Sequence, residues 1–237
     1  MEFHSLPSTH DYAKEHLADL GDGCVLVARS QTGGRGSKGR SWVSDEGGLY
    51  FTLVLIPNFT PHLHNLTQLL CLSVCETARQ LGVAAAVKWP NDVLVEGKKI
   101  AGVLSETIFR KNDFRALLLG AGVNVAQDAL RVEGREVSSL RAEKCTVSPK
   151  EVLEKILQSF FVNYDAVLRV GFTAIRRDYL ARLDGLGEVV SVDAGGEPLR
   201  GVMQTVSEEG KLIVVSEGNV VHEVLMGELL CSNKGWR

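Results

Sequence analysis

The segment Gly34-Arg35-Gly36-Ser37-Lys38-Gly39-Arg40-Ser41-Trp42 stands between two apolar runs, and the interpretation of the whole chain depends on it. Three glycines alternate with three basic side chains, and an aromatic residue closes the segment. Glycine lets the backbone turn tightly and bring its N–H groups close to an anion, while arginine and lysine add positive charge. The pattern suits a phosphate-binding loop and, equally, a solvent-exposed hairpin.

The flanking runs indicate strands. Residues 24–29 form a short apolar run, and residues 49–56 are almost continuously apolar, which predicts a buried strand. Before them, Ser8 can cap a short helix. The apolar residues of that helix share one face, and they are Ala13, Leu17 and Leu20.

Helical and strand patterns follow along the rest of the chain. Helices are predicted over residues 66–81, 149–170 and 174–183, and strands over residues 93–95, 99–106 and 117–125. The second of these helices has a strong start, because Ser148 can cap it and Glu151 can complete a capping box. A polar loop is predicted over residues 126–147.

After Gly185 the pattern changes to short strands separated by glycine-containing turns. They are predicted over residues 188–194, 199–206, 212–216 and 220–225, an arrangement typical of a small antiparallel barrel. We therefore expect an α+β fold in two domains. Residues 1–184 would form a central mixed β-sheet with helices on one face, and residues 185–237 the barrel.

Composition excludes several classes of protein. The chain has 237 residues, 45% of them hydrophobic and 23% charged, as is ordinary for a globular protein. A net charge of -3 argues against a protein that mainly coats nucleic acid. No apolar run is long enough to span a membrane, and no signal peptide is evident. The five scattered cysteines form no CxxC pair, so we expect a reduced, cytoplasmic protein.

Three further segments place glycine or polar residues where a strand ends or is interrupted. In Lys88-Trp89-Pro90-Asn91-Asp92, proline removes a ladder donor and so marks a sheet edge, a bulge or a strand end. A lysine beside such a break can face a cavity, although a lone lysine more commonly lies on the surface. In Lys99-Ile100-Ala101-Gly102, the glycine allows a flat ligand to approach the backbone or, equally, allows the sheet to pack tightly. Gly120-Ala121-Gly122-Val123-Asn124 offers the same close approach and an amide that both donates and accepts hydrogen bonds.

Together and in this order, with Ser8-Thr9 at a helix start and with Gln31, the four segments resemble the biotin protein ligases. The Lys-Trp-Pro-Asn-Asp segment is the most specific of them. The resemblance covers nearly the whole chain. It implies a class II synthetase-like catalytic domain followed by an SH3-like barrel, whose last strand would lie near Met226-Gly227-Glu228.

The resemblance also implies a two-step reaction. ATP and biotin would form biotinyl-5′-adenylate, which would then acylate a lysine of a biotin carboxyl carrier protein domain in a biotin-dependent carboxylase. Mg²⁺ is expected to accompany ATP, held mainly through phosphates and water. The motifs begin close to Met1, so we expect a monofunctional ligase without a DNA-binding domain. An exposed edge strand would be compatible with a homodimer.

Roles for individual residues follow from the resemblance. Lys88 and Arg35 are expected to be catalytic, stabilising charge as the biotin carboxylate attacks the α-phosphate. The expected biotin contacts are Ser8, Thr9, His10, Gln31, Gly34, Arg35, Lys88, Gly102 and Gly122. The expected ATP and adenylate contacts are Arg35, Gly36, Ser37, Lys38, Gly39, Arg40, Trp42, Lys88, Asn91 and Asn124. No protein ligand for a metal is expected.

Two positions depart from the family pattern. His10 stands where the family usually has asparagine, and an imidazole does not reproduce the hydrogen bonding of an amide. Ser37 stands where the family usually has arginine. Because serine supplies no cation, we expect weaker retention of the adenylate unless Lys38 or Arg40 substitutes.

Alternative functions stay open at this point. A lipoate ligase or octanoyl transferase would use the same kind of scaffold, although the basic loop followed by Lys88-Trp89-Pro90-Asn91-Asp92 favours biotin. An anion-binding or nucleic-acid-binding module would show steeply salt-dependent binding and no ATP turnover. A catalytically inactive scaffold is the third alternative.

Overall fold

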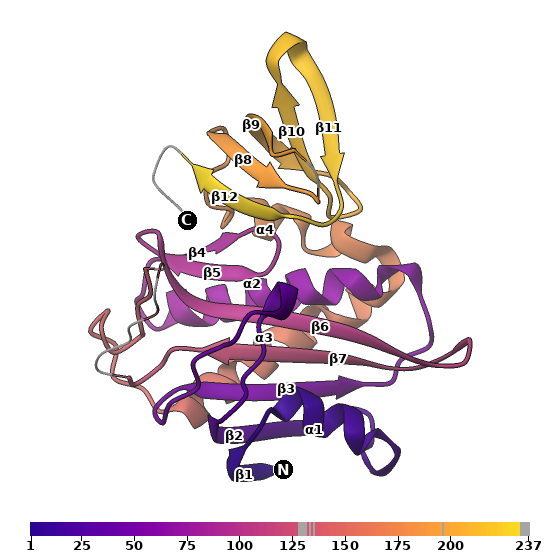
Figure 1. Cartoon of the computed structure of the whole chain (residues 1–237), viewed down its shortest axis with the longest axis vertical. Helices are drawn as coiled ribbons and strands as arrows, with labels where there is room; N and C mark the ends of the chain where they lie inside the picture. The colour runs from indigo at the N-terminus through magenta and orange to yellow at the C-terminus, as the bar shows by residue number, and fades with distance from the viewer. Residues whose placement is uncertain (128–131, 133, 135, 196, 233–237) are drawn as a thin grey trace.

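The computed structural model describes residues 1–127, 132, 134, 136–195 and 197–232, and it contains two β-sheets (Figure 1). The first sheet has seven strands in the spatial order β1-β2-β3-β7-β6-β5-β4. Their bounds are β1 Glu2–Leu6, β2 Val25–Gln31, β3 Leu49–Leu55, β4 Ala85–Lys88, β5 Asp92–Val95, β6 Lys98–Arg110 and β7 Asp113–Val123. The sheet is mixed, because β1 pairs with β2 in parallel while all other neighbours are antiparallel.

Helices cover both faces of this sheet. The long helices α2 (Asn65–Gln80) and α3 (Pro149–Val170) pack on one face, as expected, whereas the short α1 (Thr9–Glu15) lies on the opposite face. Alternate residues of β3 follow this division, since Leu53 joins the core under α2 and Val54 joins the cluster under α1. Every residue of β3 is consequently buried, which explains its almost continuous apolar sequence.

The predicted start and end of α3 are confirmed. The Ser148 side chain accepts from the Glu151 backbone N–H, and the Glu151 carboxylate accepts from the Ser148 N–H, which completes the capping box. Gly171 ends the helix in a left-handed conformation, with φ of +70°. The helix predicted over residues 174–183 is shorter, because a 3₁₀ turn, Gly171–Ala174, precedes α4 (Arg176–Leu180).

The second sheet is antiparallel, with five strands in the order β11-β10-β9-β8-β12. Their bounds are β8 Val189–Asp193, β9 Leu199–Val206, β10 Leu212–Ser216, β11 Val220–Val224 and β12 Glu228–Ser232. Figure 1 shows this sheet beyond the β4–β5 edge of the first one. Gln68 of α2 and Trp89 of the β4–β5 turn contact the β9–β10 turn, since Gln68 Nε2 and Trp89 Nε1 both donate to the carbonyl of Gly210, at 2.8 and 3.3 Å.

Strand β1 was not predicted. Its residues are mostly exposed and form no apolar run, so the sequence pattern does not indicate a strand there. The strand is defined by its pairing with β2. The polar loop predicted over residues 126–147 includes residues 128–131, 133 and 135, which lie outside the described residues. Within the described part of the chain, no helix is both long enough and apolar enough to cross a membrane.

Candidate active site

Two adjoining cavities lie between strands of the first sheet and residues 34–42, which we call the glycine loop. The inner cavity, of about 50 Å³, is lined by Ser8, Thr9, Gln31, Arg35, Gly36, Ser37, Trp42, Phe51, Asn91, Asp92, Lys99, Gly102, Val103, Leu104, Gly120, Ala121 and Gly122. The outer cavity, of about 590 Å³, lies between the glycine loop, the turn from β4 to β5 and the second sheet. The two share Ser37, Asn91, Asp92, Val103 and Leu104, so they form one continuous site.

Glycines let the Trp42 indole lie directly on the backbone of β6 and β7. Gly102 and Gly122 are opposite each other in the β6–β7 register. A Cβ added at Gly122 would lie 2.4 Å from Trp42 Nε1, and one added at Gly102 would lie 3.0 Å from Trp42 Cζ3. Trp42 Nε1 is buried and has no hydrogen-bond partner among the described residues, so this donor is available to a ligand.

The Lys99 side chain lies against this indole. Its Nζ lies 5.2 Å from the centroid of the Trp42 ring, within cation–π distance. The same Nζ lies 2.6 Å from Asp92 Oδ1, where β6 and β5 begin. This ion pair is about four-fifths buried and fixes Lys99 at the wall of the inner cavity.

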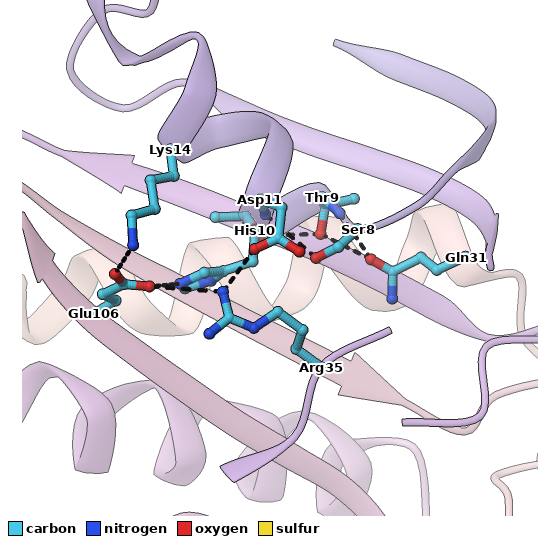
Figure 2. Close-up of polar contacts among 9 residues, drawn as sticks. Ser8, Thr9, His10, Asp11, Lys14, Gln31, Arg35 and Glu106 are labelled. Atoms are coloured by element: carbon cyan, nitrogen blue, oxygen red, sulfur yellow. Dashed lines mark hydrogen bonds and ion pairs between the residues drawn. The ribbon is translucent and has the colours of Figure 1, made fainter. Parts of the chain in front are cut away.

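The start of α1 joins the end of β2 through hydrogen bonds (Figure 2). The Thr9 backbone N–H donates to Gln31 Oε1 at 2.8 Å, and the Thr9 hydroxyl lies 3.2 Å from the same oxygen. Gln31 Nε2 donates in turn to Ser44 Oγ at 3.0 Å. Ser8 Oγ accepts from the Asp11 N–H and caps α1, as predicted. Polar groups of three segments therefore converge at one end of the inner cavity.

Arg35 lies beside two carboxylates and a buried histidine (Figure 2). Its Nη1 is 2.6 Å from Asp11 Oδ1 and 3.8 Å from Glu106 Oε2. The opposite Glu106 oxygen pairs with Lys14 Nζ at 2.5 Å, while His10 Nε2 lies 3.3 Å from Glu106 Oε2. Burial lowers the pKa of His10. Burial opposes the charged form of Glu106, but Lys14, His10 and Arg35 outweigh it, so the pKa of Glu106 is lowered.

The other cations of the glycine loop point toward the second sheet. Lys38 Nζ lies 2.7 Å from Asp193 Oδ2 and 3.4 Å from Glu228 Oε2, and Arg40 Nη1 lies 2.5 Å from Glu228 Oε1. Arg40 also donates to the backbone and hydroxyl oxygens of Ser37, at 3.1 and 2.9 Å. The loop thus reaches the outer cavity with its cations paired to carboxylates.

Lys88 ends β4 and is 8% exposed. It lines the outer cavity, where the hairpin register places it opposite Asp92. Asn91 stabilises the turn between them, because its Nδ2 donates to the Val103 carbonyl at 2.7 Å. As predicted, the Pro90-containing segment falls at a strand end.

The structure gathers most of the predicted site residues. The residues that line the inner cavity are Ser8, Thr9, Gln31, Arg35, Gly36, Ser37, Trp42, Asn91, Gly102 and Gly122. Those that line only the outer cavity are Lys38, Arg40 and Lys88. Four predicted residues line neither of these cavities, namely His10, Gly34, Gly39 and Asn124. The Asn124 side chain instead donates to the carbonyls of Lys99 and Ser138, at 3.4 and 2.9 Å.

The predicted site residues did not include Asp11, Asp92, Lys99 or Glu106. Asp92 and Lys99 belong to the quoted motifs, and their position where strands begin could have indicated that they lie at the site. Glu106 gives no such signal, because its neighbours come from α1 and the glycine loop, far away in sequence.

Comparison with known proteins gives consistent results. The model of the Biotin/lipoate A/B protein ligase family matches residues 2–124. A biotin–[acetyl-CoA-carboxylase] ligase of Paracoccus denitrificans is 33% identical over 87% of this chain and 90% of its own length. The bifunctional ligase/repressor BirA of Bacillus spizizenii is 30% identical over 90% of this chain and 67% of its own length. The solved biotin protein ligase from Aquifex aeolicus in complex with biotin and ATP is 32% identical. It superimposes with a TM-score of 0.86 over 97% of this chain and 96% of that one.

Proposed function

This chain belongs to the Biotin/lipoate A/B protein ligase family and, within it, to the biotin protein ligases, and we propose how its residues carry out that activity. The reaction has two steps. A biotin carboxylate oxygen attacks the α-phosphorus of ATP, so that a P–O bond forms and pyrophosphate leaves. The neutral lysine amine of the acceptor then attacks the carbonyl of biotinyl-5′-AMP, and the bond from this carbon to the phosphate oxygen breaks. AMP leaves with the bonding electrons, and the attacking nitrogen releases one proton to solvent, which leaves an amide.

Lys88 and Arg35 stabilise the charge that develops in the first step. They approach the joined cavities from different elements, the end of β4 and the glycine loop. A preorganised donor aimed at developing charge is typically worth about 3 kcal/mol. Lys88 is buried, so its charge acts in a medium where electrostatic interactions are strong.

The inner cavity binds biotin. Ser8, Thr9 and Gln31 supply the mixture of donors and acceptors that a ureido ring requires. Gly102 and Gly122 have no side chains, so the Trp42 indole can lie on the backbone and form one wall of the cavity. Its Nε1, which has no partner among the described residues, is available to a flat ligand.

The glycine loop and the outer cavity bind the ATP phosphates. Gly36 and Ser37 line the inner cavity, and Lys38, Arg40 and Asn91 line the outer one, so a nucleotide can lie across both. Mg²⁺ enters as the magnesium complex of ATP. The acceptor is the biotin carboxyl carrier domain of a biotin-dependent carboxylase, as the name of the Paracoccus relative suggests. A homodimer and a boundary between residues 184 and 185 stay predictions.

The observation that carries the proposal is the meeting of the four motif segments around one continuous pair of cavities. Incubation of the protein with ATP, biotin and an apo carrier domain tests it. We expect one biotinylated lysine by peptide mass spectrometry. Transfer of lipoate in place of biotin would assign the chain to the sister activity, and transfer of neither would refute a ligase function.

A further inference from the structure

A single carboxylate, Glu106, brings together three ionisable side chains from two different segments. Oε1 pairs with Lys14, and Oε2 faces both His10 and Arg35 (Figure 2). Glu106 belongs to β6, whereas Lys14 and His10 belong to α1 and Arg35 to the glycine loop. The pairing therefore ties the loop to the rigid sheet.

Two carboxylates meet at one nitrogen of Arg35. Nη1 lies 2.6 Å from Asp11 Oδ1 and 3.8 Å from Glu106 Oε2. A guanidinium carries five N–H donors in a fixed plane. Among the described residues, no acceptor is bound to Nε or Nη2 of Arg35, and the side chain lines the inner cavity. Asp11 thus hydrogen-bonds Nη1, Glu106 attracts the same nitrogen as an ion pair, and the other donors are left for an anionic ligand.

We infer that Glu106 and Asp11 are positioning residues for Arg35, which they orient from the wall of the inner cavity toward the substrate carboxylate and α-phosphate. The inference deepens the proposed function and rests on it. Glu106 and Asp11 would not touch the reacting atoms themselves. Their contribution is geometric, because a guanidinium fixed by two carboxylates needs no reorganisation when charge develops beside it.

His10 fits this arrangement. Its ring is 4% exposed, and Nδ1 faces the backbone at Gly120, where an added Cβ would lie 3.0 Å away. The charged groups that face it are Glu106, Arg35 and Asp11. Its Nε2 lies 3.3 Å from Glu106 Oε2, so the buried ring packs against the oxygen that faces Arg35. Lys14 occupies only the other oxygen.

A second explanation of the same contacts is purely structural, in that Glu106 would only anchor α1 through Lys14. The chain offers a direct control for it. Lys14→Met removes the anchor and leaves the Arg35 contacts intact, whereas Glu106→Gln and Asp11→Asn weaken the hold on Arg35. Because the guanidinium acts on developing charge, the positioning role predicts a loss in kcat with little change in KM.

The experiment measures biotin-dependent exchange of pyrophosphate into ATP for the wild type, these three variants, Arg35→Ala and the double variant Arg35→Ala/Glu106→Gln. Thermal melting checks that each variant is folded. We expect Glu106→Gln to lower kcat about tenfold or more at similar KM values. Asp11→Asn should act in the same direction, and Lys14→Met should exchange as the wild type does. Glu106→Gln should add little to the loss caused by Arg35→Ala.

Three results would overturn the inference. They are an unchanged kcat in both Glu106→Gln and Asp11→Asn, an equal loss in Lys14→Met, and a full additional loss when Glu106→Gln is combined with Arg35→Ala. Absence of exchange in the wild type would instead refute the proposed function, and the inference would fall with it. The wild-type result therefore distinguishes the two failures.

Discussion

Lys38 Nζ in the glycine loop lies 2.7 Å from Asp193 Oδ2 in the second sheet, 155 residues further along the chain. Glu228, in β12, forms ion pairs with both Lys38 and Arg40. These side chains are one-third to one-half exposed, so each pair contributes modestly to stability. The pairs nevertheless fix where two loop cations point, and under the proposed function an incoming phosphate would compete with Asp193 and Glu228 for them.

We predict that the double variant Asp193→Asn/Glu228→Gln frees the loop, because it removes both carboxylates that hold Lys38 and Arg40. Trypsin cleaves after Lys and Arg, so limited proteolysis should cut this loop faster in the variant. Glu223→Gln is the matched control, since Glu223 pairs with Lys211 on the same sheet and away from the loop. Equal cleavage in all three proteins would show that the ion pairs do not restrain the loop.

Ser37→Arg should slow the release of biotinyl-5′-AMP. Ser37 carries no charge, and the neighbouring cations Lys38 and Arg40 are already paired with Asp193 and Glu228. An added arginine would supply a bidentate phosphate partner. Release of labelled adenylate, measured by rapid filtration, should be about tenfold slower or more. Ser41→Arg, on the exposed end of the same loop, controls for charge alone. Wild-type release as slow as that of Ser37→Arg would contradict the expectation.

Gly122→Ala should weaken biotin binding by tenfold or more, a rough estimate for an overpacked site. The new methyl group would lie 2.4 Å from Trp42 Nε1 and would push the indole off the sheet. Gly21→Ala is the control, because its added Cβ meets no atom within 4 Å and its φ is not positive. Calorimetric titration with biotin measures both. Equal affinity in the two variants would show that the indole need not lie on the backbone.

The stability of the protein should fall as the pH drops below 6.5. Burial lowers the pKa of His10 from its ordinary value of 6.5, so the unfolded chain takes up a proton that the folded chain excludes. The stabilisation is complete above 6.5 and is lost as the pH falls toward the folded pKa. The pKa of Glu106 is lowered from 4.5, so the stabilisation that Glu106 contributes is lost only as the pH falls below 4.5.

Thermal melting across this range tests the assignment. His10→Asn should flatten the decline in Tm below pH 6.5, whereas the exposed His4→Asn should leave it unchanged. An identical decline in the wild type and in His10→Asn would assign the pH dependence to other groups.

Local patterns in the sequence predicted local structure well. The capping box at Ser148 and the glycine at position 171 set both ends of α3, and the apolar run of β3 indicated a strand buried on both faces. The motif segments also met at one site, as the resemblance to biotin protein ligases implied. These features depend on neighbouring residues or on the order of motifs.

Features that depend on long-range packing could not be predicted. Strand β1 lacks an apolar run and exists through its parallel pairing with β2. The pairing of Glu106 with Lys14 and Arg35 requires α1 to lie over the face of the sheet that α2 leaves uncovered. The same holds for Lys38 and Asp193, whose contact depends on how the second sheet meets the glycine loop.

Biotin-dependent exchange of labelled pyrophosphate into ATP shows whether Lys88 and the joined cavities activate biotin with ATP. We predict exchange that requires biotin, that lipoate does not support, and that falls about a hundredfold in Lys88→Ala. The exposed Lys98→Ala should behave as the wild type does. Exchange without biotin, or exchange that Lys88→Ala leaves unchanged, would show that Lys88 does not take part in activating biotin.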